Sequence, residues 1–403
     1  MNIDYDPFFS AHPEDPYPVY AALRREAPVY WAERSKTWVV SRYDDVMSVL
    51  KDTARFSSDA MATVLVGATP RRSYDGTPGA PRPSVVTSDP PVHTALRDVV
   101  NRGFTPRQIS AWKPEVEKIV DECVANMRAK TSFDLVADLS NPMPVIVIAN
   151  VLGVDPARYA DFRKWATIIT MGMNGSKRHL GFVGSGAAAA STEMSKYLAE
   201  IIARKTSASG NDLISVLVRA KEGDVLTAQE AIIFANLLLF AGSETTTNLI
   251  GNAICALLGQ PETLARVQAN LQLIAPVIEE TLRWDPPVHY LFRRATQDVE
   301  VSGTVIPEAS IVTILLGSAN RDETACGSDA AEFILDRKMA NPHLAFGFGA
   351  HFCLGASLAR MEATAALQRV IPLLSNARRT SVAVNYIDSF QFRGPAALPM
   401  EWT

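Results

Sequence analysis

Cysteine is scarce in this sequence. The 403 residues include four cysteines, Cys123, Cys255, Cys326 and Cys353, which lie far apart and form no CxxC pair. Neither a disulfide framework nor a zinc cluster is indicated, because both need cysteines that occur in sets. Each cysteine must therefore be interpreted from its own surroundings.

An excess of positive charge and long apolar runs are also lacking. The 39 Lys and Arg residues are outnumbered by 43 Asp and Glu residues, so we expect no nucleic-acid partner. The most apolar run, Ala231–Gly242, is interrupted by Asn236 and is shorter than the roughly 18 apolar residues of a membrane span. Acidic residues stand near the N-terminus, where a signal peptide would carry basic ones. We expect a cytoplasmic protein with no membrane span.

Helical periodicity dominates what is present. Hydrophobic residues make up 47% of the chain, and neither a linker nor an internal repeat divides it. We predict one domain over residues 1–403, mainly α-helical with small β-sheets. Helices are expected at Pro18–Glu26, after Tyr43, and at His93–Phe104, Trp112–Ala129, Ala157–Met171, Ala187–Lys205, Leu213–Lys221, Ala228–Leu258, Leu264–Trp284 and Gly355–Leu374.

Strands and loops are predicted from alternation and from glycine and proline content. A binding loop is expected over Asp59–Ser84, and a glycine-rich connection over Gly172–Gly186. Short strands are expected at Val29–Trp31, Thr37–Val40, Val299–Val301, Val305–Ile306, Ile311–Leu316 and within Tyr386–Trp402.

The segment Phe346–Gly355, FGFGAHFCLG, places one cysteine at the start of a predicted helix. A thiolate is stabilised there by free backbone N–H groups and the helix dipole, which suits metal ligation. Gly349 and Gly355 leave room for a flat group to approach the backbone. A small buried hydrophobic residue is the alternative for any lone cysteine, but these surroundings favour a ligand.

This segment resembles the haem-ligand loop of the cytochrome P-450 superfamily, whose pattern FxxGxHxCxG is matched at Phe346, Gly349, His351, Cys353 and Gly355. The resemblance implies a cytochrome P450 fold with haem b between the long central helix and this loop. It further implies that Cys353 binds the iron and that Phe346, Gly347 and Gly355 contact the haem.

A second matching motif is Glu280–Arg283, which resembles the ExxR motif of the family. The spacing of three puts both side chains on one helical face. In the family the pair is buried and structural, as buried charges must be paired. An exposed helix pair is the alternative for an isolated ExxR.

A third set of residues matches the contacts that the family makes with the haem propionates. His93 and Arg97 form an HxxxR pair on one helical face, and Arg293 and His351 match the remaining contacts. A solvated surface charge is the alternative for each residue taken singly. Leu291 departs from members that carry a polar residue near a propionate.

The long helix Ala228–Leu258 opens with the sequence of a capping box, Thr227 to Glu230, and carries AGSETT at its middle. Gly and Thr are poor helix formers, so they make the middle of this helix locally less stable. By resemblance, Ala241 contacts the haem, and Glu244 and Thr245 relay protons through water during dioxygen activation. A hydroxyl bonded to the carbonyl four residues earlier is the alternative for Thr245.

The resemblance implies a haem-thiolate monooxygenase that hydroxylates a lipophilic small molecule with O2. The chain has no GxGxxG after a strand and no iron–sulfur cysteine set, so electrons are expected from NAD(P)H through a ferredoxin reductase and a ferredoxin. A monomer is expected. Two alternatives are a hydrogen-peroxide-using peroxygenase and a non-catalytic haem sensor or carrier, and the retained acid–alcohol pair argues against both.

The sequence says less about the substrate pocket than about any other part of the site. By position in the family it is lined by Leu237, Phe240, Ala241, Val288, His289, Leu291 and Phe392, with further residues from Asp59–Ser84 and Ile168–Ser191. Because these are mainly apolar, we expect a terpenoid, steroid, fatty acid or polyketide. His289 either hydrogen-bonds a polar group of the substrate or turns away to a backbone carbonyl.

Overall fold

The computed structural model describes residues 3–9, 14–66, 84–174, 185–205, 212–222, 226–381 and 383–403. Most of the expected loop Asp59–Ser84 and of the glycine-rich connection Gly172–Gly186 lies outside these residues. At the start of the expected loop the chain forms a short helix, α3 (Ala60–Val66), so this part of the loop prediction was wrong. The run AMATVLV contains neither glycine nor proline, which allows a helical turn.

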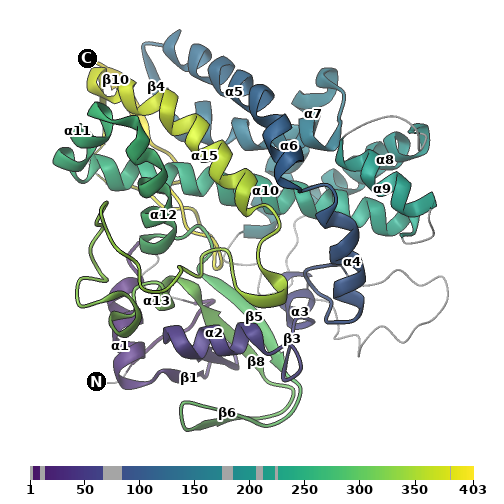
Figure 1. The fold of residues 1–403 in the computed structure, drawn as a ribbon, viewed down its shortest axis with the longest axis vertical. Helices are drawn as coiled ribbons and strands as arrows, with labels where there is room; N and C mark the ends of the chain where they lie inside the picture. Colours follow the sequence, from purple (N-terminus) through teal and green to yellow (C-terminus); the bar gives the residue numbers. More distant parts are fainter. Residues whose placement is uncertain are drawn as a thin grey trace.

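Helices make up most of the described chain (Figure 1). The α-helices besides α3 are α1 (Tyr17–Glu26), α2 (Tyr43–Lys51), α4 (Val92–Asn101), α5 (Pro106–Arg128), α6 (Pro142–Leu152), α7 (Tyr159–Asn174), α8 (Ser185–Arg204), α9 (Leu213–Glu222), α10 (Ala228–Leu258), α11 (Pro261–Ala269), α12 (Ile274–Trp284), α13 (Leu316–Ala319), α14 (Glu323–Cys326) and α15 (Ala356–Val370). A π-helical turn, η1 (Val136–Ser140), and the 3₁₀ turns η2 (Pro156–Arg158), η4 (Leu271–Leu273), η5 (Gly349–His351) and η6 (Ile371–Asn376) complete the set.

The strands form small sheets, the largest of which lies at the end of the molecule near α1 and α2 (Figure 1). Its order is β1-β2-β8-β5-β3, with β2 and β8 parallel and the other pairs antiparallel. A second sheet has the order β4-β10-β9, and β6 and β7 form a hairpin. The strands are β1 (Val29–Ala32), β2 (Thr37–Val40), β3 (Phe56–Ser57), β4 (Ser132–Asp134), β5 (Tyr290–Ala295), β6 (Val299–Val301), β7 (Thr304–Ile306), β8 (Ile311–Leu315), β9 (Ala377–Arg379) and β10 (Pro399–Trp402).

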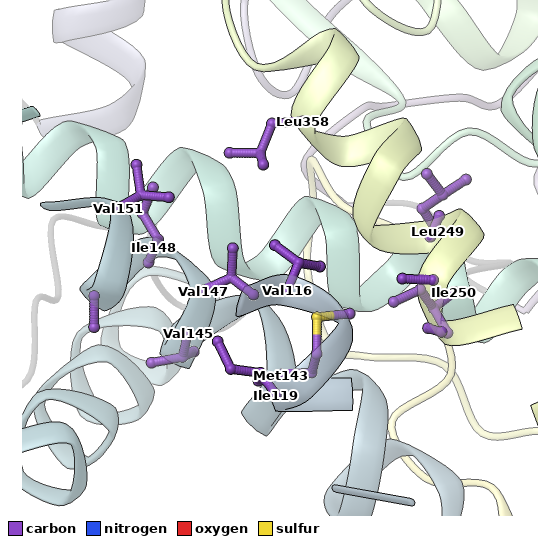
Figure 2. Close-up of a cluster of buried hydrophobic side chains, with 14 of the residues drawn as sticks. Val116, Ile119, Met143, Val145, Val147, Ile148, Val151, Leu249, Ile250 and Leu358 are labelled. Carbon is purple, nitrogen blue, oxygen red and sulfur yellow. The ribbon is translucent and has the colours of Figure 1, made fainter. Parts of the chain in front are cut away.

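Helix α6 was not predicted from the sequence. Its residues PMPVIVIANVL are apolar on nearly every side, so no amphipathic period marks it. Figure 2 shows why this composition is needed: Val147 and Ile148 lie within a cluster that also contains Val116 of α5, Leu249 of α10 and Leu358 of α15. Because α6 packs against α5, α7 and α10, it has little surface to present to water and carries no polar stripe.

Several predicted elements differ from the structure by a few residues in their bounds, and two predictions differ more deeply. The expected helix Leu264–Trp284 is two helices, because Asn270 ends α11 and its side chain accepts a hydrogen bond from the backbone N–H of Gln272 at the start of the next turn. The strand expected within Tyr386–Trp402 is confined to β10, preceded by isolated bridges that pair Val288 with Phe392 and Tyr386 with Pro395.

Helix α10 crosses the middle of the molecule and has the predicted bounds, Ala228–Leu258. Its capping box is confirmed: the Thr227 hydroxyl accepts from Glu230 N at 3.2 Å, and the Glu230 carboxylate accepts from Thr227 N at 2.8 Å. Helices α6, α12 and α15 all pack against α10. The long helix is therefore held on several sides, and poor helix formers at its middle can be tolerated.

One buried carboxyl group in this helical core is unpaired. Glu362 of α15 is 3% exposed, and its Oε2 has no hydrogen-bond partner among the described residues. Burial raises the pKa of this carboxyl well above its usual range. Because the folded chain holds the proton more tightly than the unfolded chain, folding stability falls as pH rises from the ordinary value of 4.5 toward the folded pKa.

We predict that Glu362→Gln becomes progressively more stable relative to the native chain as pH rises above the ordinary glutamate pKa. The slope of the difference is at most about 1.4 kcal/mol per pH unit, the value for one proton. Urea unfolding measured at several pH values gives this slope, while any constant cost of the buried amide changes only the offset. The same substitution at exposed Glu122 of α5 serves as control. A pH-independent difference would contradict the prediction.

Candidate functional site

Cys353 lies directly before helix α15, in a segment that we call the Cys loop, residues 344–355. The backbone N–H of Cys353 donates to Phe346 O at 2.9 Å, which folds the loop back on itself. Burial raises the pKa of the thiol, while hydrogen bonds from the N–H groups of Gly355 and Ala356 lower it. The side chain is nevertheless exposed. The sulfur is therefore accessible, with N–H groups at the start of the helix already directed at it.

The glycines of the Cys loop have two different roles. Gly349 has a φ of +73°, and a Cβ there would lie 3.1 Å from Leu50 O at the end of α2. This glycine therefore lets the loop pack on α2, which corrects the expectation that it makes room for a flat group. A Cβ on Gly355 would meet nothing within 4 Å, so the open space is on the Gly355 side.

Helix α12 holds the Cys loop at both ends. Glu279 accepts two hydrogen bonds from Arg360 of α15, at 2.6 and 2.9 Å, and lies 3.2 Å from His343 Nε2 just before the loop. Burial tends to raise the pKa of Glu279, but the hydrogen bonds from Arg360 and His343 lower it to about 2. The Arg360 guanidinium also lies over the Phe346 ring, 4.6 Å from its centroid. Sequence reasoning missed Glu279, because no local pattern marks a partner 81 residues away.

Next to Glu279, the predicted pair Glu280 and Arg283 is buried, with side chains 3% and 0% exposed. Two hydrogen bonds of 2.7 Å join them. The remaining N–H groups of Arg283 donate to the carbonyls of Asn320, Ala330 and Glu332. The exposed alternative is thus excluded, and the pair holds the segment that leads toward the Cys loop.

The four residues expected to bind carboxylates act on one another electrostatically. Burial, together with the smaller effect of the positive charges of Arg293, His93 and Arg97, lowers the pKa of His351 to about 3. Burial also lowers the pKa of Arg293 to about 10. The rings of His93 and His351 are 4.1 Å apart between centroids. These donors, from α4, β5 and the Cys loop, therefore form one electropositive group.

This group has unused donors. Arg293 is 2% exposed and His93 is 3% exposed, yet Arg293 Nε and His93 Nε2 have no hydrogen-bond partner among the described residues. A buried polar atom without a partner is costly, so its presence indicates a ligand. Arg97 interacts electrostatically with Cys353, which places the donor group beside the thiol. A planar group that carries a thiolate-bound iron and two carboxylates, as haem does, fits this set of residues.

Helix α10 contributes the predicted residues at its middle. Ala241 is exposed although it lies in the central helix, and Thr245 is partly exposed. The Thr245 hydroxyl donates to Ala241 O at 2.7 Å, which is the alternative geometry considered from the sequence. Burial raises the pKa of Glu244, and the Asn248 side chain, one turn later, acts on this pKa in the opposite direction. The helix thus presents an alcohol and an acid side by side.

Several of the expected pocket residues come together around Phe392. Val288 pairs with Phe392 through an isolated bridge, and the Phe392 ring lies 5.9 Å from the Phe240 ring of α10. Leu237 is partly buried one turn before Phe240. Leu291 lies beside the Cys loop, since a Cβ on Gly347 would be 3.8 Å from Leu291 Cδ1. These contacts make an apolar surface next to the middle of α10.

The structure does not place His289 among these residues. Its ring packs against Tyr17 and Tyr20 of α1, and Nδ1 lies 3.1 Å from the Tyr20 hydroxyl. Successive side chains of an extended segment point in opposite directions, so Val288 and His289 face different sides. The expected hydrogen bond from His289 to a substrate is therefore replaced by one to a tyrosine, not by the backbone carbonyl considered as the alternative.

The apolar surface is fastened to α10 by close backbone contacts. A Cβ on Gly251 would lie 2.6 Å from Pro395 Cγ, and one on Gly394 would lie 2.2 Å from Asn248 Oδ1. Asn252 Nδ2 donates to the carbonyls of Asp285 and Arg393, at 2.9 and 3.1 Å. The segments on either side of Val288 and Phe392 are thus bound to the same face of the helix.

Comparisons with known proteins decide the family. A family model described as Cytochrome P450 matches residues 185–376. The putative cytochrome P450 YjiB of Bacillus subtilis (strain 168) is 38% identical over 360 residues, which cover 88% of this chain and 86% of that protein. The chain belongs to the cytochrome P450 superfamily. Another relative of this P450, the cytochrome P450 monooxygenase PikC of Streptomyces venezuelae, is 37% identical over 96% of this chain and 91% of its own length.

Solved structures agree with this assignment. Cytochrome P450 CYP109Q5 from Chondromyces apiculatus has a TM-score of 0.87 and 38% identity, and the match covers 100% of this chain and 99% of that one. CYP109E1 from Bacillus megaterium, solved in complex with corticosterone, has a TM-score of 0.84 and 35% identity over 96% of this chain and 98% of that one. The fold is the cytochrome P450 fold, and the protein is a P450 monooxygenase, an oxidoreductase that uses haem iron and O2. Within the described residues of this P450, no helix is both long and apolar enough to span a membrane.

We predict that the reduced carbon monoxide complex of the P450 shows the long-wavelength Soret band of a thiolate ligand and that Cys353→His loses it. A histidine replaces thiolate donation by a neutral nitrogen, which changes the spectrum even where haem is retained. Absorption spectra of freshly purified protein provide the measurement. Cys326→Ala, at a cysteine whose Sγ lies 3.4 Å from a backbone carbonyl, is the control and should keep the band.

Proposed function

We propose that Cys353 ligates the iron of haem b and that His93, Arg97, Arg293 and His351 bind its two carboxylates. The observation that carries this proposal is the pair of orphaned donors, Arg293 Nε and His93 Nε2, buried in the electropositive group beside the thiol. Helix N–H groups directed at the sulfur support the thiolate form. Phe346, Gly347 and Gly355 complete the contacts on the side of the Cys loop.

Haem bound there supplies the binding and activation of O2 and the insertion of one oxygen atom into a C–H bond. We assign proton delivery to Glu244 and Thr245. The raised pKa of Glu244 makes its carboxyl a better holder of a proton than an exposed glutamate. The Thr245 hydroxyl, which donates to Ala241 O, can redirect its proton by rotation about one bond.

The substrate is a lipophilic small molecule of terpenoid, steroid, fatty acid or polyketide type. Leu237, Phe240, Ala241, Val288, Leu291 and Phe392 supply apolar contacts, and the described part of this surface carries no charged side chain. Steroid complexes of CYP109E1, with corticosterone and with testosterone, support a ligand of this size and polarity. His289 is left out of this set because it faces α1.

Electrons come from NAD(P)H through a ferredoxin reductase and a ferredoxin to this chain, which acts as a single catalytic domain and as a monomer. Turnover with surrogate ferredoxin partners tests the function. Lipophilic candidates are first screened by the Soret shift that follows displacement of water from the iron. We expect substrate-dependent NADPH consumption with hydroxylated product. Product formed efficiently from hydrogen peroxide without the ferredoxin would favour the peroxygenase alternative, and binding without turnover would favour a sensor.

We predict that Thr245→Ala keeps haem and substrate affinity but diverts most reducing equivalents to hydrogen peroxide. Loss of the hydroxyl removes a donor where protons are needed, while the helix itself loses only a local bond. The ratio of product to NADPH consumed measures this coupling. Ser243→Ala is a matched control, because Ser243 makes the same kind of bond, to Leu239 O at 2.8 Å, and is buried. Equal coupling in both variants would show that Thr245 has only a helical role.

A further inference from the structure

Asp89 is the one acidic residue that acts on the pKa of buried Arg293, in opposition to the effect of burial. It also raises the pKa of His93, against the larger effect of burial. A carboxylate beside a site for carboxylates needs an explanation, because like charges repel. Asp89 is held there by hydrogen bonds to Ser57, Ser58 and His93.

Both carboxylate oxygens of Asp89 accept hydrogen bonds from the chain at the end of β3. Oδ1 accepts from the backbone N–H of Ser58 at 2.8 Å, and Oδ2 accepts from the Ser57 hydroxyl. The Asp89 carbonyl accepts from His93 N at 2.9 Å, next to the start of α4. Asp89 therefore joins the segment before the excursion of residues 59–88 to the helix that carries His93 and Arg97.

Ser58 continues this connection to the Cys loop. It is fully buried, and its hydroxyl lies 2.9 Å from His351 Nε2. A carboxylate can only accept hydrogen bonds, so a neutral His351 must present a protonated nitrogen to it. Because Nε2 is occupied by Ser58, the nitrogen left for a haem carboxylate is Nδ1. The Ser58 hydroxyl then donates to Nε2 and keeps the ring proton on Nδ1.

We propose that Asp89 and Ser58 are positioning residues for the haem carboxylates: Asp89 fixes Ser58, and Ser58 sets the tautomer and orientation of His351. This inference rests on the proposed haem site. It adds to that site a set of groups that do not touch the cofactor but hold those that do. It also ties both ends of the 59–88 excursion to the carboxylate-binding group.

The test measures haem transfer from the purified holoenzyme to excess apomyoglobin, together with the propionate bending band in the resonance Raman spectrum. We expect Ser58→Ala and Asp89→Asn each to speed haem transfer by about tenfold, the effect of one lost hydrogen bond to a charged group. Both variants should also shift the propionate band. Asp98→Asn on the exposed side of α4 and Ser48→Ala on the exposed side of α2 are the matched controls and should match the native enzyme.

A double-mutant cycle with His351→Gln separates positioning from general destabilisation. If Ser58 acts through His351, Ser58→Ala adds nothing to the transfer rate of His351→Gln. An unchanged rate and band in Ser58→Ala, or full additivity in the cycle, would overturn the proposal. If Asp89→Asn does not fold, Ser58→Ala decides alone. A native enzyme without the thiolate carbon monoxide band would instead refute the haem assignment.

Discussion

Arg283 has no contact with solvent, and each of its five N–H groups has an acceptor within hydrogen-bond distance. Breaking such a buried pair by removing one partner costs about 3–5 kcal/mol, because the remaining charge is left uncompensated. The carbonyls that Arg283 binds belong to Asn320, Ala330 and Glu332. Asn320 in turn accepts from Leu344 N at 2.6 Å, at the first residue of the Cys loop. The position of the thiol thus depends on an ion pair one helix away.

The same helix supports the loop a second time through Glu279, so one element, α12, controls both ends of the segment that carries Cys353. Such repeated support suits a site whose ligands must be held before the cofactor is present. The electropositive group is likewise supported by more than one element, because its donors come from a helix, a strand and a loop.

The sequence predicted what short-range chemistry determines. Residues of the Cys loop, the Glu280–Arg283 pair and the bounds of α10 follow from motifs, spacing and capping, and the structure places them accordingly. Helix α6 was not predicted because it is apolar on nearly every side. The role of Glu279 was not predicted because its partners are distant in sequence. The sequence did not predict the direction of His289, because either Val288 or His289 could have faced α10 and no local pattern distinguishes the two. In Thr245 the structure shows the bond considered as an alternative, and this bond is compatible with a catalytic hydroxyl.

The close approach of α10 to the segment after Phe392 has a consequence for how this P450 can change its substrates. Gly251 and Gly394 admit contacts that no larger residue would permit, so the helix and this wall meet where a glycine packs directly against the side chain of Pro395 or Asn248. With the proposed substrate pocket, altering the bulk of Phe392, Val288 or Phe240 would therefore reshape the pocket while the frame around these residues stays unchanged. On the proposed function, changes in specificity would then leave in place the part of α10 that carries Glu244 and Thr245, so a new substrate would not require a rebuilt helix.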